Sequence, residues 1–228
     1  MNPVKKFRAL SKGSFLPDPI DLTDPEHRRL AHLHYTWFDH AILRRPWTNF
    51  FEIAPGVFRS NQPSHERFET YAKMGLKTVI NLRGKSPDRP SYLFEQESCA
   101  RLGLDLIDLT LEARGAPNRD NLLQLITLFR ELERPFLFHC KSGADRAGMA
   151  SAVYKLVIEN APVAEAKQML SLKYIHLKWT KTGILGYFLD IYGARTAKSE
   201  IAFEDWLRDE YDPQALSDGF KNGRKIPS

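Results

Sequence analysis

The sequence predicts an α/β fold: a three-layer α/β/α arrangement around a central, mostly parallel sheet of four to five strands. Two observations predict it. Short apolar segments with strand character alternate with segments of 10–15 residues that have helical periodicity. Glycine or proline stands at most of the boundaries between them. The 228 residues, 43% of them hydrophobic, are enough for one such domain with extensions.

Composition divides the chain into three zones. Residues 1–45 form an N-terminal extension with scattered prolines and aromatic residues at 35, 37 and 38, and we expect it to pack onto the next segment. Residues 46–195 form the main domain. Residues 196–228 form a C-terminal tail, in which the apolar positions between 200 and 211 predict one short amphipathic helix.

The main domain begins with a hairpin over 50–58, with its turn at Pro55-Gly56. Ser64 is a suitable N-cap for a helix to about residue 74, where Gly75 ends it, and 77–82 follows as a buried strand. Two further helix–strand units and a last helix come next. They are predicted over 91–102 and 104–109, over 119–132 and 135–139, and over 146–158.

Charge and cysteine content exclude several classes of protein. No stretch without a charged residue exceeds roughly nine residues, whereas a membrane-spanning helix needs about 18 apolar residues. The net charge of +5 comes without a nucleic-acid-binding motif, so we expect no nucleic acid partner. The basic residues within 1–12 give at most weak peripheral membrane contact. Two cysteines, no metal-ligand spacing and no secretory signal predict a cytoplasmic protein without a metal or other cofactor.

The segment from His139 to Gly148 follows an apolar strand and opens a helix. Backbone N–H groups at such a turn, together with the helix dipole, favour a bound phosphate. The same field favours the thiolate form of Cys140. Arg146 is able to return over the loop as a bidentate phosphate ligand, and Gly143 permits the backbone conformation. The loop residues Lys141, Ser142, Gly143 and Ala144 are therefore predicted to bind substrate phosphate through their amides.

This segment, HCKSGADRAG, resembles the H-C-x5-R signature of cysteine-based protein tyrosine phosphatases. The order of elements before the cysteine resembles the dual-specificity type, and residues 56–64 with 77–83 resemble its bacterial members. The resemblance covers about two-thirds of the chain. It implies a metal-independent, two-step hydrolysis in which Cys140 forms a phosphocysteine, Arg146 holds phosphate, and His139 orients the loop.

The general acid is one of several carboxylates, of which Asp108 is slightly favoured. In the family an aspartate about thirty residues before the cysteine protonates the leaving oxygen, and Asp108 fits by distance. Asp145 is a rival, because its place before the arginine resembles the loop aspartate of myotubularins. Asp120 and Glu112 are further alternatives.

Several residues bear on substrate and turnover. Ala147 replaces the usual Ser or Thr after the arginine, which predicts slow breakdown of the phosphocysteine. Arg83 and Lys85 follow a strand on the same side of the sheet and are predicted to line the pocket. Cys99 is either a buried structural residue or a disulfide partner for Cys140.

The predicted substrate is a phosphorylated protein or a small phosphomonoester. The alternatives are a phosphoinositide, lipid or sugar phosphate substrate, or a catalytically weak phosphate-binding module.

Overall fold

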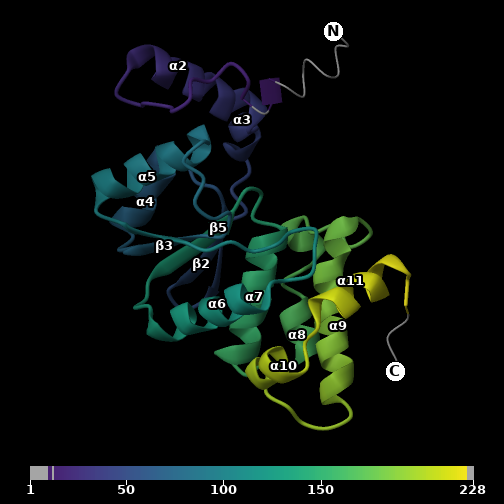
Figure 1. Cartoon of the computed structure of the whole chain (residues 1–228). Coiled ribbons are helices and arrows are strands. Elements are labelled where there is room, and N and C mark those ends of the chain that lie inside the picture. The colour runs from purple at the N-terminus through teal and green to yellow at the C-terminus, as the bar shows by residue number, and fades with distance from the viewer. Residues whose placement is uncertain (1–9, 12, 225–228) are drawn as a thin grey trace.

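The computed structural model describes residues 10–11 and 13–224, and it has the predicted α/β architecture (Figure 1). Most of the basic segment 1–12, to which weak membrane contact was assigned, lies outside the described residues. A five-stranded sheet has the order β1-β2-β5-β3-β4, in which only the β1–β2 pair is antiparallel. The strands are β1 (Phe51–Ala54), β2 (Val57–Asn61), β3 (Thr78–Asn81), β4 (Asp105–Asp108) and β5 (Phe136–Cys140).

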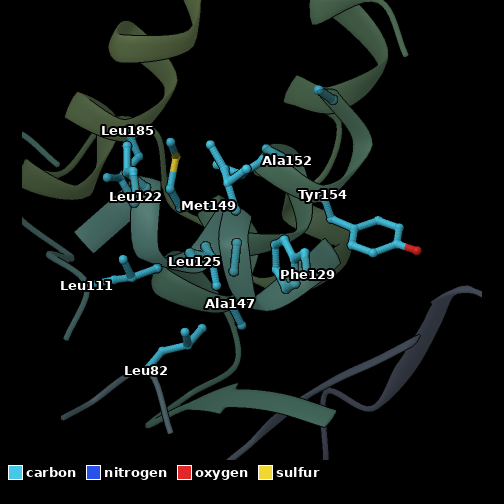
Figure 2. Packing of buried hydrophobic residues seen from close by; sticks show 14 of the residues in the cluster. Leu82, Leu111, Leu122, Leu125, Phe129, Ala147, Met149, Ala152, Tyr154 and Leu185 are labelled. Atoms are coloured by element: carbon cyan, nitrogen blue, oxygen red, sulfur yellow. The ribbon is translucent and has the colours of Figure 1, made fainter. Parts of the chain in front are cut away.

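Helices cover both faces of the sheet. On one face, α4 (His65–Lys73) and α5 (Pro90–Leu102) pack against Val79 and Leu137. On the other, α6 (Arg119–Glu131) and α7 (Asp145–Val157) pack against Ile80 and the phenylalanines of β5. Figure 2 shows this larger core, where Leu125 and Phe129 of α6 lie beside α7. Successive strand residues thus alternate between two cores, as the period of two requires.

The strand register brings polar residues to one edge of the sheet. Asn61 pairs with Cys140, Asn81 pairs with His139, and Asn81 also pairs with Asp108. Because four neighbouring strands run parallel, their carboxyl ends meet on the side where β5 leads into α7. This edge positions the candidate site.

The N-terminal extension lies against α5 (Figure 1). It consists of α2 (Pro25–Leu33), a π-helical turn η1 (His34–Phe38) and α3 (Ala41–Arg44). Arg28 of α2 forms an ion pair of 2.7 Å with Glu97, and the rings of His32 and Tyr35 lie 4.8 and 5.6 Å from that of Phe94. The extension is therefore an ordered layer over this face of the domain.

The chain after α7 is helical throughout. It contains α8 (Val163–Lys167), the 3-10 turns η2 (Leu172–Tyr174) and η3 (Lys181–Gly183), α9 (Ile184–Thr196), α10 (Phe203–Asp209) and α11 (Pro213–Lys221).

The prediction of a single helix in the tail is wrong. Asp212 caps the N-terminus of a second helix by accepting hydrogen bonds from two backbone N–H groups, and Pro213 stands at its first position. Within the described ranges, no helix has both the length and the apolar character needed to span a membrane.

Candidate active site

The loop after β5 connects Cys140, the last strand residue, to Asp145, the first residue of α7. Gly143 in this loop has a φ of 74°, and a Cβ placed on it would lie 2.7 Å from the backbone N of Asn61. Both the conformation and the close approach require glycine, as predicted from the sequence. Cys140 itself is buried, with 2% of its surface exposed.

The carbonyl groups of the loop point outward, because each accepts a hydrogen bond from another segment. Lys141 O accepts from the backbone N of Gln62 at 3.3 Å, and Ser142 O accepts from Asn49 Nδ2 at 3.0 Å. Arg59 Nη2 donates to the carbonyls of residues 143 and 144 at 2.6 and 3.3 Å. The N–H groups of residues 141–143 have no acceptor among the described residues. The loop is thus a ring of backbone donors suited to an anion.

Arg59 is a buried cation behind this loop. Its side chain also donates to Met169 O at 3.1 Å and lies 3.9 Å from the centroid of the Tyr174 ring. Burial lowers the pKa of Arg59 to about 10, against the opposing effect of Tyr174 and Cys140, so at neutral pH the guanidinium is charged. Arg59 therefore places a fixed positive charge behind the phosphate loop.

Arg146 lies in the first turn of α7, where the signature places it. Its guanidinium makes no hydrogen bond or ion pair with any residue the structure describes, and its Nε is buried. A half-buried arginine whose buried Nε has no partner points to an anionic ligand. In the same described part of the chain, no group of three or more His, Cys, Asp or Glu side chains is placed to hold a metal ion.

His139 connects the loop to α5. The ring is fully buried; its Nδ1 lies 3.3 Å from Cys140 O, and its Nε2 forms an ion pair with Glu95. Glu95 also accepts a hydrogen bond of 2.9 Å from Gln62 Nε2. The sequence contained one signal for Glu95 that was not used: it shares a buried helix face with Tyr92 and Cys99.

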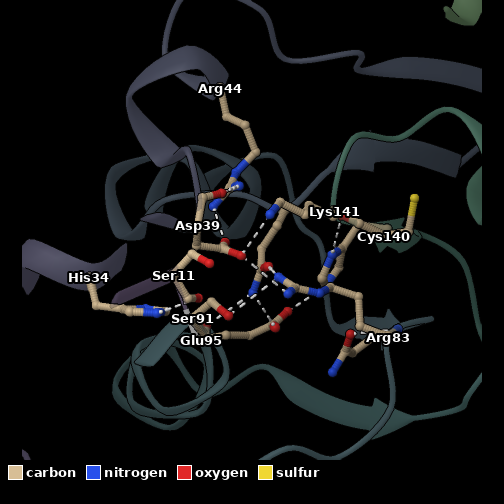
Figure 3. Close-up of polar contacts among 12 residues, drawn as sticks. Ser11, His34, Asp39, Arg44, Arg83, Ser91, Glu95, Cys140 and Lys141 are labelled. Carbon is tan, nitrogen blue, oxygen red and sulfur yellow. Dashed lines mark hydrogen bonds and ion pairs between the residues drawn. The ribbon is translucent and has the colours of Figure 1, made fainter. Parts of the chain in front are cut away.

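The extension contributes a carboxylate to the site that sequence analysis missed. Asp39 lies 3.1 Å from Lys141 Nζ, 3.4 Å from Arg83 Nη2 and 2.8 Å from Arg44 Nη2 (Figure 3). Burial acts to raise the pKa of Asp39, but Arg83, Arg44 and Lys141 outweigh it and hold the pKa below its usual value. No sequence pattern links Asp39 to a loop one hundred residues away.

The two predicted pocket residues after β3 differ in their surroundings. Arg83 is 10% exposed and is held by Asp39, by Gln62 and by Ser91 Oγ at 3.3 Å. It is therefore brought to the loop but is committed to protein partners. Lys85 is exposed to solvent.

The candidate general acids are held differently. Asp108 accepts hydrogen bonds on both oxygens, from Asn81 Nδ2 at 2.9 Å and from Tyr92 OH at 2.6 Å. Burial and the bond to Asp108 raise the pKa of Tyr92. Asp145 Oδ1 lies 2.8 Å from Nδ1 of the buried His176, a residue that sequence analysis did not select. Of the two further alternatives, Glu112 accepts from the backbone N of residue 118 at 2.9 Å, and Asp120 is exposed.

Cys99 lies in the smaller core between α4, α5 and the sheet, with 1% of its surface exposed. Burial raises the pKa of the Cys99 thiol to about 12, so it stays protonated and unreactive at neutral pH. Both cysteines are free thiols.

Sequence comparison finds similar proteins that are named as phosphatases. A rice (Oryza sativa subsp. japonica) protein named inositol diphosphatase DSP2 is 25% identical over 113 residues, which cover 49% of this chain and 55% of the relative. Dual specificity protein phosphatase TpbA of Pseudomonas aeruginosa (strain UCBPP-PA14) is 26% identical over 119 residues, covering 50% of this chain and 49% of TpbA. The chain thus spans about half the length of the curated relatives it matches.

Solved structures share the fold. The crystal structure of P. aeruginosa TpbA superposes with a TM-score of 0.50 at 19% identity, over 67% of this chain and 92% of that one. A putative phosphatase from Shewanella putrefaciens CN-32 gives a TM-score of 0.50 at 18% identity, over 70% and 99%.

The family described as "DSP-PTPase phosphatase fused to NAD+ Kinase" matches residues 52–182, more than half of the chain. This range includes the whole loop from Cys140 to Arg146 and the strands that position it. The chain therefore belongs to this phosphatase family of the dual-specificity, protein-tyrosine-phosphatase type.

Proposed function

We propose that the protein hydrolyses phosphomonoesters through a phosphocysteine on Cys140. The observation that carries this proposal is the loop in which every carbonyl from 141 to 144 is bonded outward and the amides are left for a ligand. A phosphoryl group in this loop accepts hydrogen bonds from the loop N–H groups and from the unpartnered guanidinium of Arg146. These donors stabilise the charge on the equatorial oxygens during transfer.

The reaction then has two steps. The Cys140 thiolate attacks phosphorus, so an S–P bond forms and the P–O ester bond breaks, and the leaving oxygen takes a proton from a carboxylic acid. Water next attacks phosphorus and gives a proton to the same carboxylate, the S–P bond breaks, and inorganic phosphate leaves with the thiolate and the carboxylic acid both restored. His139, with Glu95 and Gln62 behind it, positions the loop and does not touch the substrate.

For the proton donor we propose Asp145. One of its oxygens is held by His176, while the other has no partner among the described residues. Asp108 has both oxygens occupied as hydrogen-bond acceptors, and β4 lies two strands from β5, roughly 10 Å away at ordinary strand spacing. A proton donor must reach the leaving oxygen, and the loop position of Asp145 favours that.

The substrate class we propose is a phosphorylated protein or a small phosphomonoester. The name of TpbA, a dual specificity protein phosphatase, supports this assignment. We place the activity in the cytoplasm, since a reducing compartment keeps the nucleophilic thiol free.

The test is hydrolysis of para-nitrophenyl phosphate with excess chelator, comparing the full-length protein with Cys140→Ser. Cys140-dependent turnover that survives the chelator is expected. The matched control is Cys99→Ser, which removes the buried thiol and leaves the loop intact. Binding of phosphate without any turnover would instead indicate a phosphate-binding module and contradict the proposal.

A further inference from the structure

Three cations converge on the single carboxylate of Asp39 beside the phosphate loop. Arg44 and Arg83 are almost fully buried, with 6% and 10% of their side chains exposed, whereas Lys141 keeps 39% exposed. Lys141 directly follows the nucleophile and is the one member of this group with an accessible ammonium. Figure 3 shows that ammonium turned toward Asp39, while the Sγ of Cys140 points away from the cluster.

The pairing of Lys141 with Asp39 weakens the binding of any ligand that carries two negative groups. The accessible cation that such a ligand would meet beside the loop is Lys141, which directly follows Cys140 and has 39% of its side chain exposed. Asp39 already occupies that ammonium at 3.1 Å, and its own charge repels a second anion. The pairing lies in a partly buried environment, where charge interactions are screened less than at the surface.

We infer that Asp39 is a specificity-determining residue. It occupies the ammonium of Lys141 and offsets one of the three positive charges beside the phosphate loop, so that the site favours a single phosphomonoester over ligands that carry a second anionic group beside it. The inference rests on the proposed phosphate site. It assigns the N-terminal extension a role in ligand selection, because α2, η1 and α3 hold Asp39 in place from outside the catalytic domain.

The test measures ligand binding and needs no turnover. Each variant is made in a full-length Cys140→Ser background, and the affinities for inorganic phosphate and inorganic pyrophosphate are measured by calorimetry. Asp39→Asn should raise the affinity for pyrophosphate by roughly tenfold and that for phosphate by about twofold or less. The gain should disappear when Lys141→Gln is added, because the freed ammonium is what binds the second anion.

The matched control is Glu97→Gln. This substitution also removes one carboxylate from the contact between the extension and α5, but Glu97 pairs with Arg28 and Arg101 and contacts neither Lys141 nor Arg83. It should leave the ratio of the two affinities unchanged. A change equal to that of Asp39→Asn would trace the effect to loosening of the extension and overturn the inference.

Two further outcomes separate the inference from the proposed function. If neither anion binds any variant, the phosphate site itself is wrong. If phosphate binds but Asp39→Asn leaves the affinity ratio unaltered, the site stands and the role of Asp39 is rejected. Should thermal melting indicate that Asp39→Asn is unfolded, Asp39→Ser makes the same charge change with a hydroxyl that still accepts from Arg44, and it decides by the same ratio.

Discussion

At the scale of single residues, Asp108 and Asp145, the two candidates for the proton donor, differ in their hydrogen bonds. Asp108 accepts on both oxygens, so neither oxygen is free to face a leaving group. Asp145 is fixed on one side by His176, which is itself buried with its Nε2 unpartnered. The pair couples the first residue of α7 to the turn after η2.

We therefore expect Asp145→Asn to lower kcat/KM by about 10²–10⁴-fold on phenyl phosphate, whose leaving group needs a proton. The loss should be much smaller on para-nitrophenyl phosphate, whose leaving group departs as an anion. Asp108→Asn should reduce both rates to a similar, smaller degree by loosening Tyr92 and Asn81. A leaving-group-dependent loss in Asp108→Asn instead would make Asp108 the acid.

Ala147 leads to a second prediction for single residues. It is fully buried in the main core (Figure 2), and it offers no hydroxyl to the departing thiolate. We expect rapid-mixing assays to record a burst of para-nitrophenol close to one equivalent per enzyme, followed by slow turnover. Ala147→Ser should shrink the burst and raise kcat by about tenfold, the effect of one added hydrogen bond. A wild type without a burst would mean that breakdown of the phosphocysteine is not limiting.

At the scale of elements, the phosphate loop is held by two segments that come from different parts of the chain. Residues 49–62 supply the donors Asn49, Arg59 and the Gln62 amide. The turn 169–176 supplies the acceptor and the ring that fix Arg59. The loop conformation therefore depends on packing between elements as much as on its own glycine.

Arg59→Lys tests this dependence. A lysine keeps the charge but has no planar fork, so the carbonyls of Gly143 and Ala144 lose donors. We expect a loss of about 2 kcal/mol in the free energy of unfolding and a KM for para-nitrophenyl phosphate that rises about tenfold. Arg130→Lys, at a surface arginine paired with Glu204, is the control and should change stability by less than about 0.5 kcal/mol. Equal effects of both substitutions would contradict the role of Arg59 in holding the phosphate loop.

Local signals account for what the sequence predicted at this scale. Gly75 and Gly103 mark helix ends within a residue or two, because capping is a property of neighbouring positions. The loop from Cys140 to Arg146 could likewise be predicted from neighbouring residues alone. Asp39 and His176 escaped prediction, since their contacts join segments whose proximity only the tertiary fold creates. The second tail helix was missed although Asp212-Pro213 carried a start signal for it.

At the scale of the whole molecule, the C-terminal tail is part of the main core. Trp206 and Phe203 of α10 pack against Phe188 of α9 and against Tyr211, with ring centroids 5.0–6.0 Å apart. Trp206 is 3% exposed. The tail thus contributes aromatic surface to the same cluster that supports α6 and α7 beneath the loop.

Trp206→Ala should lower the free energy of unfolding by about 3–5 kcal/mol, measured by denaturant titration, since it opens a cavity in this cluster. Trp179→Ala, at a tryptophan 67% exposed, should change it by less than about 0.5 kcal/mol. If the two substitutions cost the same, the tail does not stabilise the domain.

The arrangement around Arg59 also has a consequence for synthesis of the protein. When Arg146 emerges from the ribosome, the donors from residues 49–62 are already outside, but Met169, Tyr174 and His176 are not yet available to pack against the loop. The nascent chain therefore holds a nucleophilic cysteine in a loop that lacks half of its supports. The phosphate-binding shape, and with it chemical competence, arises only after the turn 169–176 has emerged and folded back, so an incomplete chain is kept from acting on phosphorylated molecules.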